Sequence, residues 1–88
     1  MEIGLDRLEP GEAGTVLRLA LPPERAAALT RLGLVPGTAV ICLRRSPLGD
    51  PAAYRWRETT VALRCRDAAE ILVKRDQTNS DLCVSSTQ

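Results

Sequence analysis

The chain has 88 residues, of which 44% are hydrophobic and 26% charged, and its formal net charge is +1. This length holds one folded domain, and this composition excludes a chain that is disordered throughout. The near-zero net charge argues against strong non-specific binding to nucleic acid, which depends on a large positive charge.

Counts of single residue types limit the chemistry further. The sequence has no histidine, so it lacks the commonest general base and metal ligand, and an enzyme is not expected. With no Phe, one Tyr and one Trp, we expect a core of Leu, Val, Ile and Ala. The cysteines form no CxxC pair, which fits neither a disulfide framework nor a zinc finger. We expect Cys42 and Cys65 to be buried and Cys83 to lie on a tail.

The beginning of the chain is not typical of a secretory leader. Glu2 and Asp6 stand where a leader has basic residues, and no apolar run approaches the ~20 residues of a membrane span. We therefore expect a cytoplasmic protein that does not insert into a membrane.

The first half of the chain predicts one strand and one helix. After an N-terminal segment that ends at Gly14, residues Thr15–Leu21 are β-rich and are bounded by prolines. Pro23 suits the first turn of a helix, which is expected over Glu24–Leu32 with Gly33 as its C-cap.

The second half predicts four more strands. Pro36-Gly37 fits the centre of a type II turn, and Thr38–Arg45 is the clearest strand. The loop Ser46–Pro51 precedes a strand over Ala53–Arg57, on which Tyr54 and Trp56 share one face. The remaining elements are a hairpin tip at Glu58-Thr59, a strand with Val61 and Leu63, a helical turn over Asp67–Ile71 and a strand at Leu72-Val73.

These elements favour a mainly β fold. Five short strands, one short helix after the first strand and a helical turn before the last fit a small SH3-like barrel. We assign residues 1–75 to this barrel and predict that residues 76–88 form a polar, disordered C-terminal tail.

Several motifs together resemble the FeoA family of bacterial ferrous-iron transport. The resemblance runs from about Leu5 to Val73, and its most specific parts are LGLVPG at Leu32–Gly37, SPLGDP at Ser46–Pro51 and ALR at Ala62–Arg64. Supporting matches are Leu8, Pro10-Gly11, Leu29, Ala68-Ala69 and Ile71. One departure is Glu58, which stands at the expected hairpin tip where the family usually has a glycine.

The resemblance implies a non-enzymatic SH3-like domain. Its expected partner is the membrane transporter FeoB, which it would bind on the cytoplasmic side and modulate. The family is also described as binding transition metals. Since the same domain occurs fused to iron-dependent repressors, the alternative is an SH3-like interaction module that acts with an iron-dependent regulator.

The motifs suggest two kinds of site residue. We assign a structural role in turns to Gly33, Pro36, Gly37, Pro47, Gly49 and Pro51. We assign partner binding to Leu48, Asp50, Arg44, Arg55 and Arg57. Leu48 is either an exposed anchor for a partner or a cap on the open end of the barrel. Asp50 is expected to accept a hydrogen bond within its own turn rather than to bind a metal.

The arginines lead to a further prediction. The chain has eleven arginines and one lysine, and six of the arginines are expected on consecutive strands or at their ends: Arg44, Arg45, Arg55, Arg57, Arg64 and Arg66. They form either an ordinary solvated surface or a basic patch that meets an acidic or phosphate-bearing partner. We expect no nucleic-acid partner, because the net charge is small and the aromatic residues are few.

The metal and the oligomeric state stay open at this level. Cys42 and Cys65 could bind a metal only if their sulfurs converged, and no imidazole is available to complete the site. We expect no firmly held cofactor, only weak binding of Fe(II) or another transition metal by surface carboxylates. Exposed edge strands could pair two copies into a homodimer.

Overall fold

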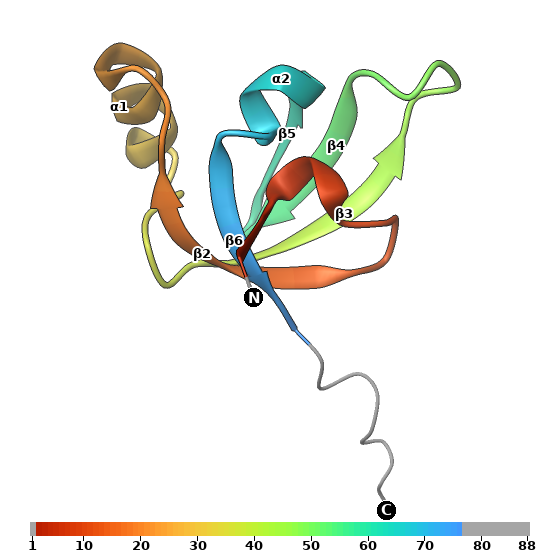
Figure 1. The fold of residues 1–88 in the computed structure, drawn as a ribbon, viewed down its shortest axis with the longest axis horizontal. Coiled ribbons are helices and arrows are strands. Elements are labelled where there is room, and N and C mark those ends of the chain that lie inside the picture. The colour runs from red at the N-terminus through yellow and green to blue at the C-terminus, as the bar shows by residue number, and fades with distance from the viewer. Residues whose placement is uncertain (1, 77–88) are drawn as a thin grey trace, which may run out of the picture.

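The structure is a computed structural model that describes residues 2–76 (Figure 1). Its strands form one antiparallel sheet in the order β1-β6-β2-β3-β4-β5. The strands are β1 (Glu2–Gly4), β2 (Ala13–Leu19), β3 (Ala39–Arg45), β4 (Ala52–Trp56), β5 (Thr59–Leu63) and β6 (Ile71–Arg75). The helices are the 3-10 turn η1 (Leu5–Arg7), α1 (Pro23–Arg31) and α2 (Cys65–Ala68).

The mainly β prediction is confirmed, but the five-stranded closed barrel is wrong. The described residues form six strands, and β1 and β5 are the unpaired edges of an open sheet. The missed strand, β1, has three residues and pairs with β6, where Ile3 lies opposite Val73. Three residues are too few to show an alternation of hydrophobic and polar side chains, and the strand with which they pair lies at the other end of the described chain. No signal in the sequence therefore indicated this strand. η1 and α2 contact each other beside the open part of the sheet (Figure 1).

The connection from α1 to β3 is built from the LGLVPG motif. Gly33 and Gly37 have φ of +95° and +94°, values that glycine adopts without strain. The turn at Gly37 is closed by the Thr38 N–H, which donates to the Val35 carbonyl at 3.0 Å. The buried Thr38 hydroxyl donates to the Gly33 carbonyl at 3.1 Å and accepts from the Val35 N–H at 3.2 Å. This threonine therefore fixes the end of α1 against the start of β3.

The expected composition of the core is wrong in one respect. Trp56 and Tyr54 are its two largest fully buried side chains, on the inner face of β4. The Trp56 indole can be buried because its N–H donates to the Leu32 carbonyl at 2.9 Å. Cys42 is buried as expected, Cys65 is half-buried, and Cys83 lies outside the described residues.

Several element boundaries differ from the prediction. The first predicted strand begins earlier than expected, at Ala13. The helix α1 begins and ends one residue earlier than predicted, at Pro23 and Arg31. The β4–β5 hairpin turns at Arg57 and Glu58, because Trp56 pairs with Thr59. The positive φ of this turn, +55°, is at Arg57 and not at Glu58, where the family usually has a glycine. Residues 77–88 of the predicted tail lie outside the described part, in which no helix is long and apolar enough to cross a membrane.

Candidate partner-binding surfaces

The structure separates the predicted partner-binding residues into two groups. Leu48 and Asp50 lie on the loop that joins β3 to β4, and Arg57 lies beyond the other end of β4. Along the β3–β4 ladder, Arg44 pairs with Ala53 near the loop, whereas Arg55 pairs with Ile41 farther along. The five residues therefore lie toward the two ends of β4 and do not form one compact patch.

The β3–β4 loop, residues 46–51, projects from the domain on the side opposite α1 (Figure 1). Its base is closed by the Ser46 N–H, which donates to the Pro51 carbonyl at 3.1 Å. Within it, the Gly49 N–H donates to the Ser46 carbonyl at 2.8 Å, and Gly49 has a φ of +86°. Leu48 is 94% exposed, so it does not cap the open end of the sheet. Of the two interpretations of Leu48, only the exposed position remains.

The loop is also held to α2. Asp50 accepts a hydrogen bond from the Cys65 N–H at 2.9 Å, and the Cys65 thiol donates to the Gly49 carbonyl at 3.3 Å. The prediction that Asp50 is an acceptor is therefore right, but its partner is α2 rather than its own turn. Burial, and then the nearby Asp50 carboxylate, raise the pKa of the Cys65 thiol. The thiol thus keeps the proton that it donates.

A shallow groove of about 330 Å³ lies on the solvent face of the sheet. We call it the outer-face groove; it is lined by Ala13, Ala39, Val40, Ile41, Arg55, Trp56 and Arg57. Arg55 and Arg57 are exposed, and within residues 2–76 neither side chain makes a hydrogen bond or an ion pair. These two guanidinium groups are therefore available to a ligand.

Arg57 is also packed against the end of α1. A Cβ built on Gly33 would lie 3.3 Å from the Arg57 Cδ, so the arginine stem passes close over this glycine. The last carbonyls of a helix carry partial negative charge and favour a cation beside them. Gly33 thus ends α1 and also leaves room for the arginine.

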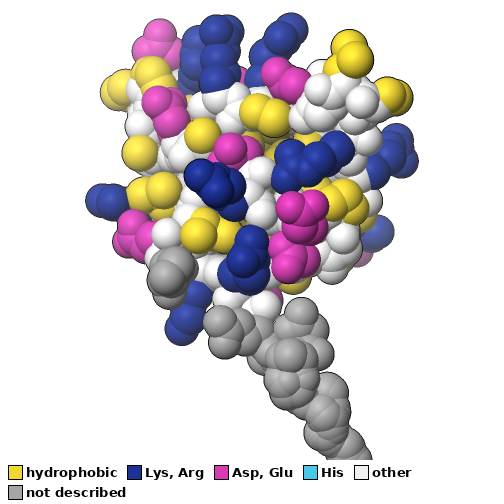
Figure 2. Space-filling model, turned by 45° about the vertical axis from the view of Figure 1, so that its right-hand side comes forward, with side chains coloured by type: hydrophobic (Ala, Val, Ile, Leu, Met, Phe, Trp, Pro, Cys, Tyr) yellow, Lys and Arg dark blue, Asp and Glu magenta, His cyan; other side chains and the backbone are white. Residues whose placement is uncertain are grey.

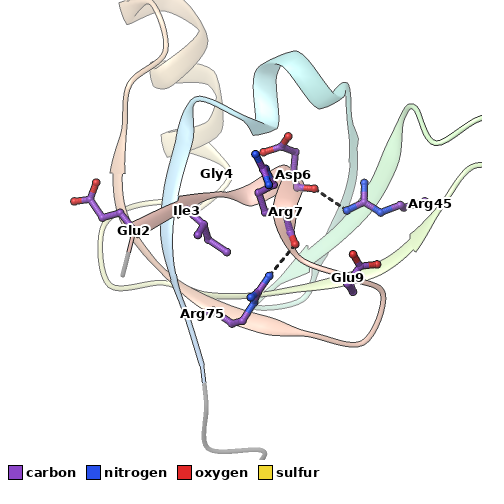
Figure 3. A pocket seen from close by; sticks show the side chains of 8 residues that line it. All are labelled: Glu2, Ile3, Gly4, Asp6, Arg7, Glu9, Arg45 and Arg75. Carbon is purple, nitrogen blue, oxygen red and sulfur yellow. Dashed lines mark hydrogen bonds between the residues drawn. The ribbon is translucent and has the colours of Figure 1, made fainter.

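A second groove, of about 570 Å³, lies beside η1 and contains both charge signs (Figure 3). We call it the polar groove; its charged lining residues are Glu2, Asp6, Arg7, Glu9, Arg45 and Arg75. Arg45 donates to the carbonyls of Asp6 and Leu8 at 2.6 and 2.8 Å. Arg75 donates to the Arg7 carbonyl at 3.0 Å and lies 3.4 Å from the Glu12 carboxylate.

These arginines tie η1 to the ends of β3 and β6, a role that the sequence analysis missed for Arg45. The only available signal was an arginine at the end of a strand. Charged side chains of both signs also alternate over the face shown in Figure 2, with small hydrophobic areas between them. This face carries no single basic patch.

The residues described do not fit a resident metal ion. Between residues 2 and 76, no group of three or more His, Cys, Asp or Glu side chains could hold one. Burial raises the pKa of the thiols of Cys42 and Cys65, which disfavours the thiolate forms that bind metals. The expected weak binding by surface carboxylates stays a prediction.

The comparisons with known proteins decide the family. A family model described as the FeoA domain matches residues 3–75. The chain belongs to the FeoA family. No curated protein sequence matches it.

Solved structures agree with this assignment. The FeoA protein of Chlorobium tepidum is 32% identical, with a TM-score of 0.80 over 83% of this chain and 70% of that one. The zinc-complexed FeoA of Stenotrophomonas maltophilia, described as a prokaryotic SH3 domain protein and candidate activating factor of ferrous iron transport, is 26% identical. Its TM-score is 0.71 over 82% of this chain and 89% of that one. A manganese-dependent transcriptional repressor shares the fold alone, with 21% identity and a TM-score of 0.77 over 85% of this chain and 41% of the repressor.

Proposed function

We propose that this FeoA-family domain is a non-enzymatic, cytoplasmic accessory protein of ferrous iron uptake. It binds the cytoplasmic part of the transporter FeoB and modulates its activity. Membership of the family supports the role in iron transport. The observation that carries the binding proposal is the 94% exposed Leu48 on a loop that hydrogen bonds hold in place.

Leu48 has the properties of an interface anchor. Burying a leucine side chain in an apolar pocket contributes about 1.5–3 kcal/mol. Two bonds between the loop and α2, from Cys65 to Asp50 and to Gly49, fix the loop before binding. A preorganised loop loses less conformational entropy when it binds, so more of the burial energy appears as affinity.

The arginines supply the polar part of the proposed contact. Arg44 lies near the loop, whereas Arg55 and Arg57 lie farther along the same hairpin. FeoB would have to contact both groups over a surface that extends along β3 and β4. This proposal covers all five predicted partner-binding residues, and the two groups can be tested separately.

The test is a binding measurement between the full chain and the purified cytoplasmic part of FeoB. Leu48→Ala is expected to weaken binding about tenfold, as truncation of an anchor residue does. The matched control is Leu17→Ala, which truncates a leucine that is 38% exposed on β2. Absence of binding by the unaltered protein at high micromolar concentration contradicts the proposal.

The second candidate is an interaction module that acts with an iron-dependent regulator. The shared fold with the manganese-dependent repressor favours it. Binding to a purified metal-dependent repressor, together with no binding to FeoB, would establish this alternative.

The proposal also allows pairing of two copies through the unpaired edges β1 and β5. Light scattering at increasing protein concentration measures the mass. A constant monomer mass rules out the homodimer and leaves binding to FeoB unaffected.

A further inference from the structure

We propose that the outer-face groove binds an extended acidic segment of a protein partner. Carboxylates of that segment pair with Arg55 and Arg57, and its small side chains lie over Ala13, Ala39 and Ile41. The inference rests on the proposed function only in requiring a protein partner, and it adds where the partner binds and what its chemistry is.

The floor of the groove is apolar. The solvent-facing positions of an antiparallel sheet are usually polar. On β3, however, successive outward positions are Ala39, Ile41 and Leu43, and Leu43 is 37% exposed. Ala13 of β2 pairs with Ile41 and extends this apolar strip to the next strand. The small alanine side chains let a ligand backbone approach the sheet.

The two arginines at the rim of the groove carry charge that no described residue compensates. Neither Arg55 nor Arg57 has an acidic partner within residues 2–76. Glu12, the residue before Ala13, is occupied elsewhere, since its carboxylate accepts from the Glu9 N–H at 2.8 Å and lies 3.4 Å from the Arg75 Nε. Guanidinium groups form paired hydrogen bonds with carboxylates. The charge of the rim therefore favours an acidic occupant.

The backbone of Arg57 has an unusual conformation for an arginine. Its φ of +55° lies in the left-handed region, where an L-residue is strained and glycine is not. A glycine would relieve this strain but would remove a guanidinium from the rim. Packing of the arginine stem over Gly33 at the end of α1 offsets part of this strain, and the guanidinium stays at the rim of the groove, where it can pair with a carboxylate.

The width of the floor indicates the form of the occupant. From β2 to β4 the sheet spans two strand spacings, about 10 Å. A helix with its side chains is about 10–12 Å across, as wide as the whole floor, whereas an extended chain takes about 5 Å beside its neighbours. A single extended chain fits. Single-stranded nucleic acid would need exposed aromatic rings for stacking, and Trp56 is buried.

The experiment measures the binding of a defined probe to the full chain by fluorescence anisotropy. The probe is a fluorescein-labelled peptide of alternating Glu and Ala, and the control peptide has Gln in place of Glu. Arg55→Gln and Arg57→Gly are each expected to weaken binding about tenfold, while Arg57→Gly leaves the melting temperature unchanged or raises it. The matched control is Arg7→Gln, which removes an exposed charge from the polar groove.

Three results would overturn the inference. The Gln peptide could bind as well as the Glu peptide, which would show that the carboxylates do not pair with the arginines. Arg7→Gln could weaken binding as much as Arg55→Gln, which would indicate unspecific charge attraction. A single-stranded oligonucleotide could also bind more tightly than the acidic peptide. Amide shifts in NMR spectra locate the contact, and the inference requires them at Ala39 and Ile41 rather than at residues 46–51.

The same variants separate this inference from the proposed function. If FeoB binding depends on Leu48 and is unchanged by Arg55→Gln and Arg57→Gly, the groove does not take the partner. The inference then fails together with the assignment of Arg55 and Arg57 to the FeoB contact, while the proposed binding through Leu48 stands. If the acidic peptide binds in the groove but FeoB does not bind, the inference stands and the proposed partner is wrong.

Discussion

The two grooves of this domain both contain arginines, but they use them differently. In the polar groove, Arg45 and Arg75 donate to main-chain carbonyls of the segment around η1. In the outer-face groove, Arg55 and Arg57 have no partner within residues 2–76. An arginine that is saturated by backbone carbonyls stabilises the fold, whereas a free one is available to a ligand. The number of arginines in the sequence does not distinguish these two kinds.

The largest effect that would test this contrast is on Arg45. Arg45→Ala is expected to lower the free energy of unfolding by about 3 kcal/mol, because two charge-assisted hydrogen bonds to the carbonyls of Asp6 and Leu8 are lost. Chemical denaturation measures the loss, with Arg44→Ala as the exposed neighbouring control. Equal stability of the two variants would show that Arg45 does not hold η1.

Tyr54 is fully buried in the core and supplies a pH-dependent test of the interior. Burial raises the pKa of its phenol to about 12 from 10, so between pH 10 and 12 only the unfolded chain loses the proton. The free energy of unfolding should therefore fall by about 2 kcal/mol as the pH rises through this window.

Tyr54→Phe is the control for this pH dependence. Among the described residues the Tyr54 hydroxyl has no hydrogen-bond partner, so its removal should leave stability near pH 7 almost unchanged. Denaturation curves at several pH values compare the two proteins. An equally steep decline in the variant would assign the pH dependence to other groups, such as the two described thiols.

Gly37 tests the turn that begins β3, the strand that supplies Ala39 and Ile41 to the outer-face groove. Gly37→Ala is expected to lower the free energy of unfolding by about 1 kcal/mol, because φ there is +94°. A Cβ at this position would meet no atom within 4 Å, so no steric clash contributes and the loss is the backbone strain less the entropy effect of alanine on the unfolded chain. Pro36→Ala is the neighbouring control, and thermal denaturation is the measurement.

The smallest effect on stability is expected at Arg55. Arg55→Gln should change the free energy of unfolding by less than about 0.5 kcal/mol, since the side chain makes no bond within residues 2–76. Urea denaturation of this variant beside Arg45→Ala sharpens the comparison of the two grooves. A loss as large as that of Arg45→Ala would mean that Arg55 also holds the fold together.

Local sequence signals predicted much of the turn framework. Proline restricts φ and glycine permits positive φ, and both act within a few residues. The end of α1 at Gly33 and the turn at Gly37 were therefore accessible from LGLVPG. The hairpin tip was placed one residue late, because Arg57, which takes the positive φ, is not a residue type that signals such a turn.

The candidate site was predicted in its residues but not in its arrangement. Leu48 and Arg57 were both assigned to partner binding, and they lie at opposite ends of β4. Which arginines are free depends on partners far along the chain, as with Arg45 and Asp6, which are 39 positions apart.

The amino-acid order alone thus determined the family, the mainly β character and the positions of the Pro-Gly corners, because each depends on nearby residues. Only the tertiary structure decided that Glu2–Gly4 pairs with β6, that the sheet stays open and that Arg55 and Arg57 have no partner between residues 2 and 76. Those features depend on which segments far apart in the sequence come into contact and form hydrogen bonds, and local conformational preference does not determine this.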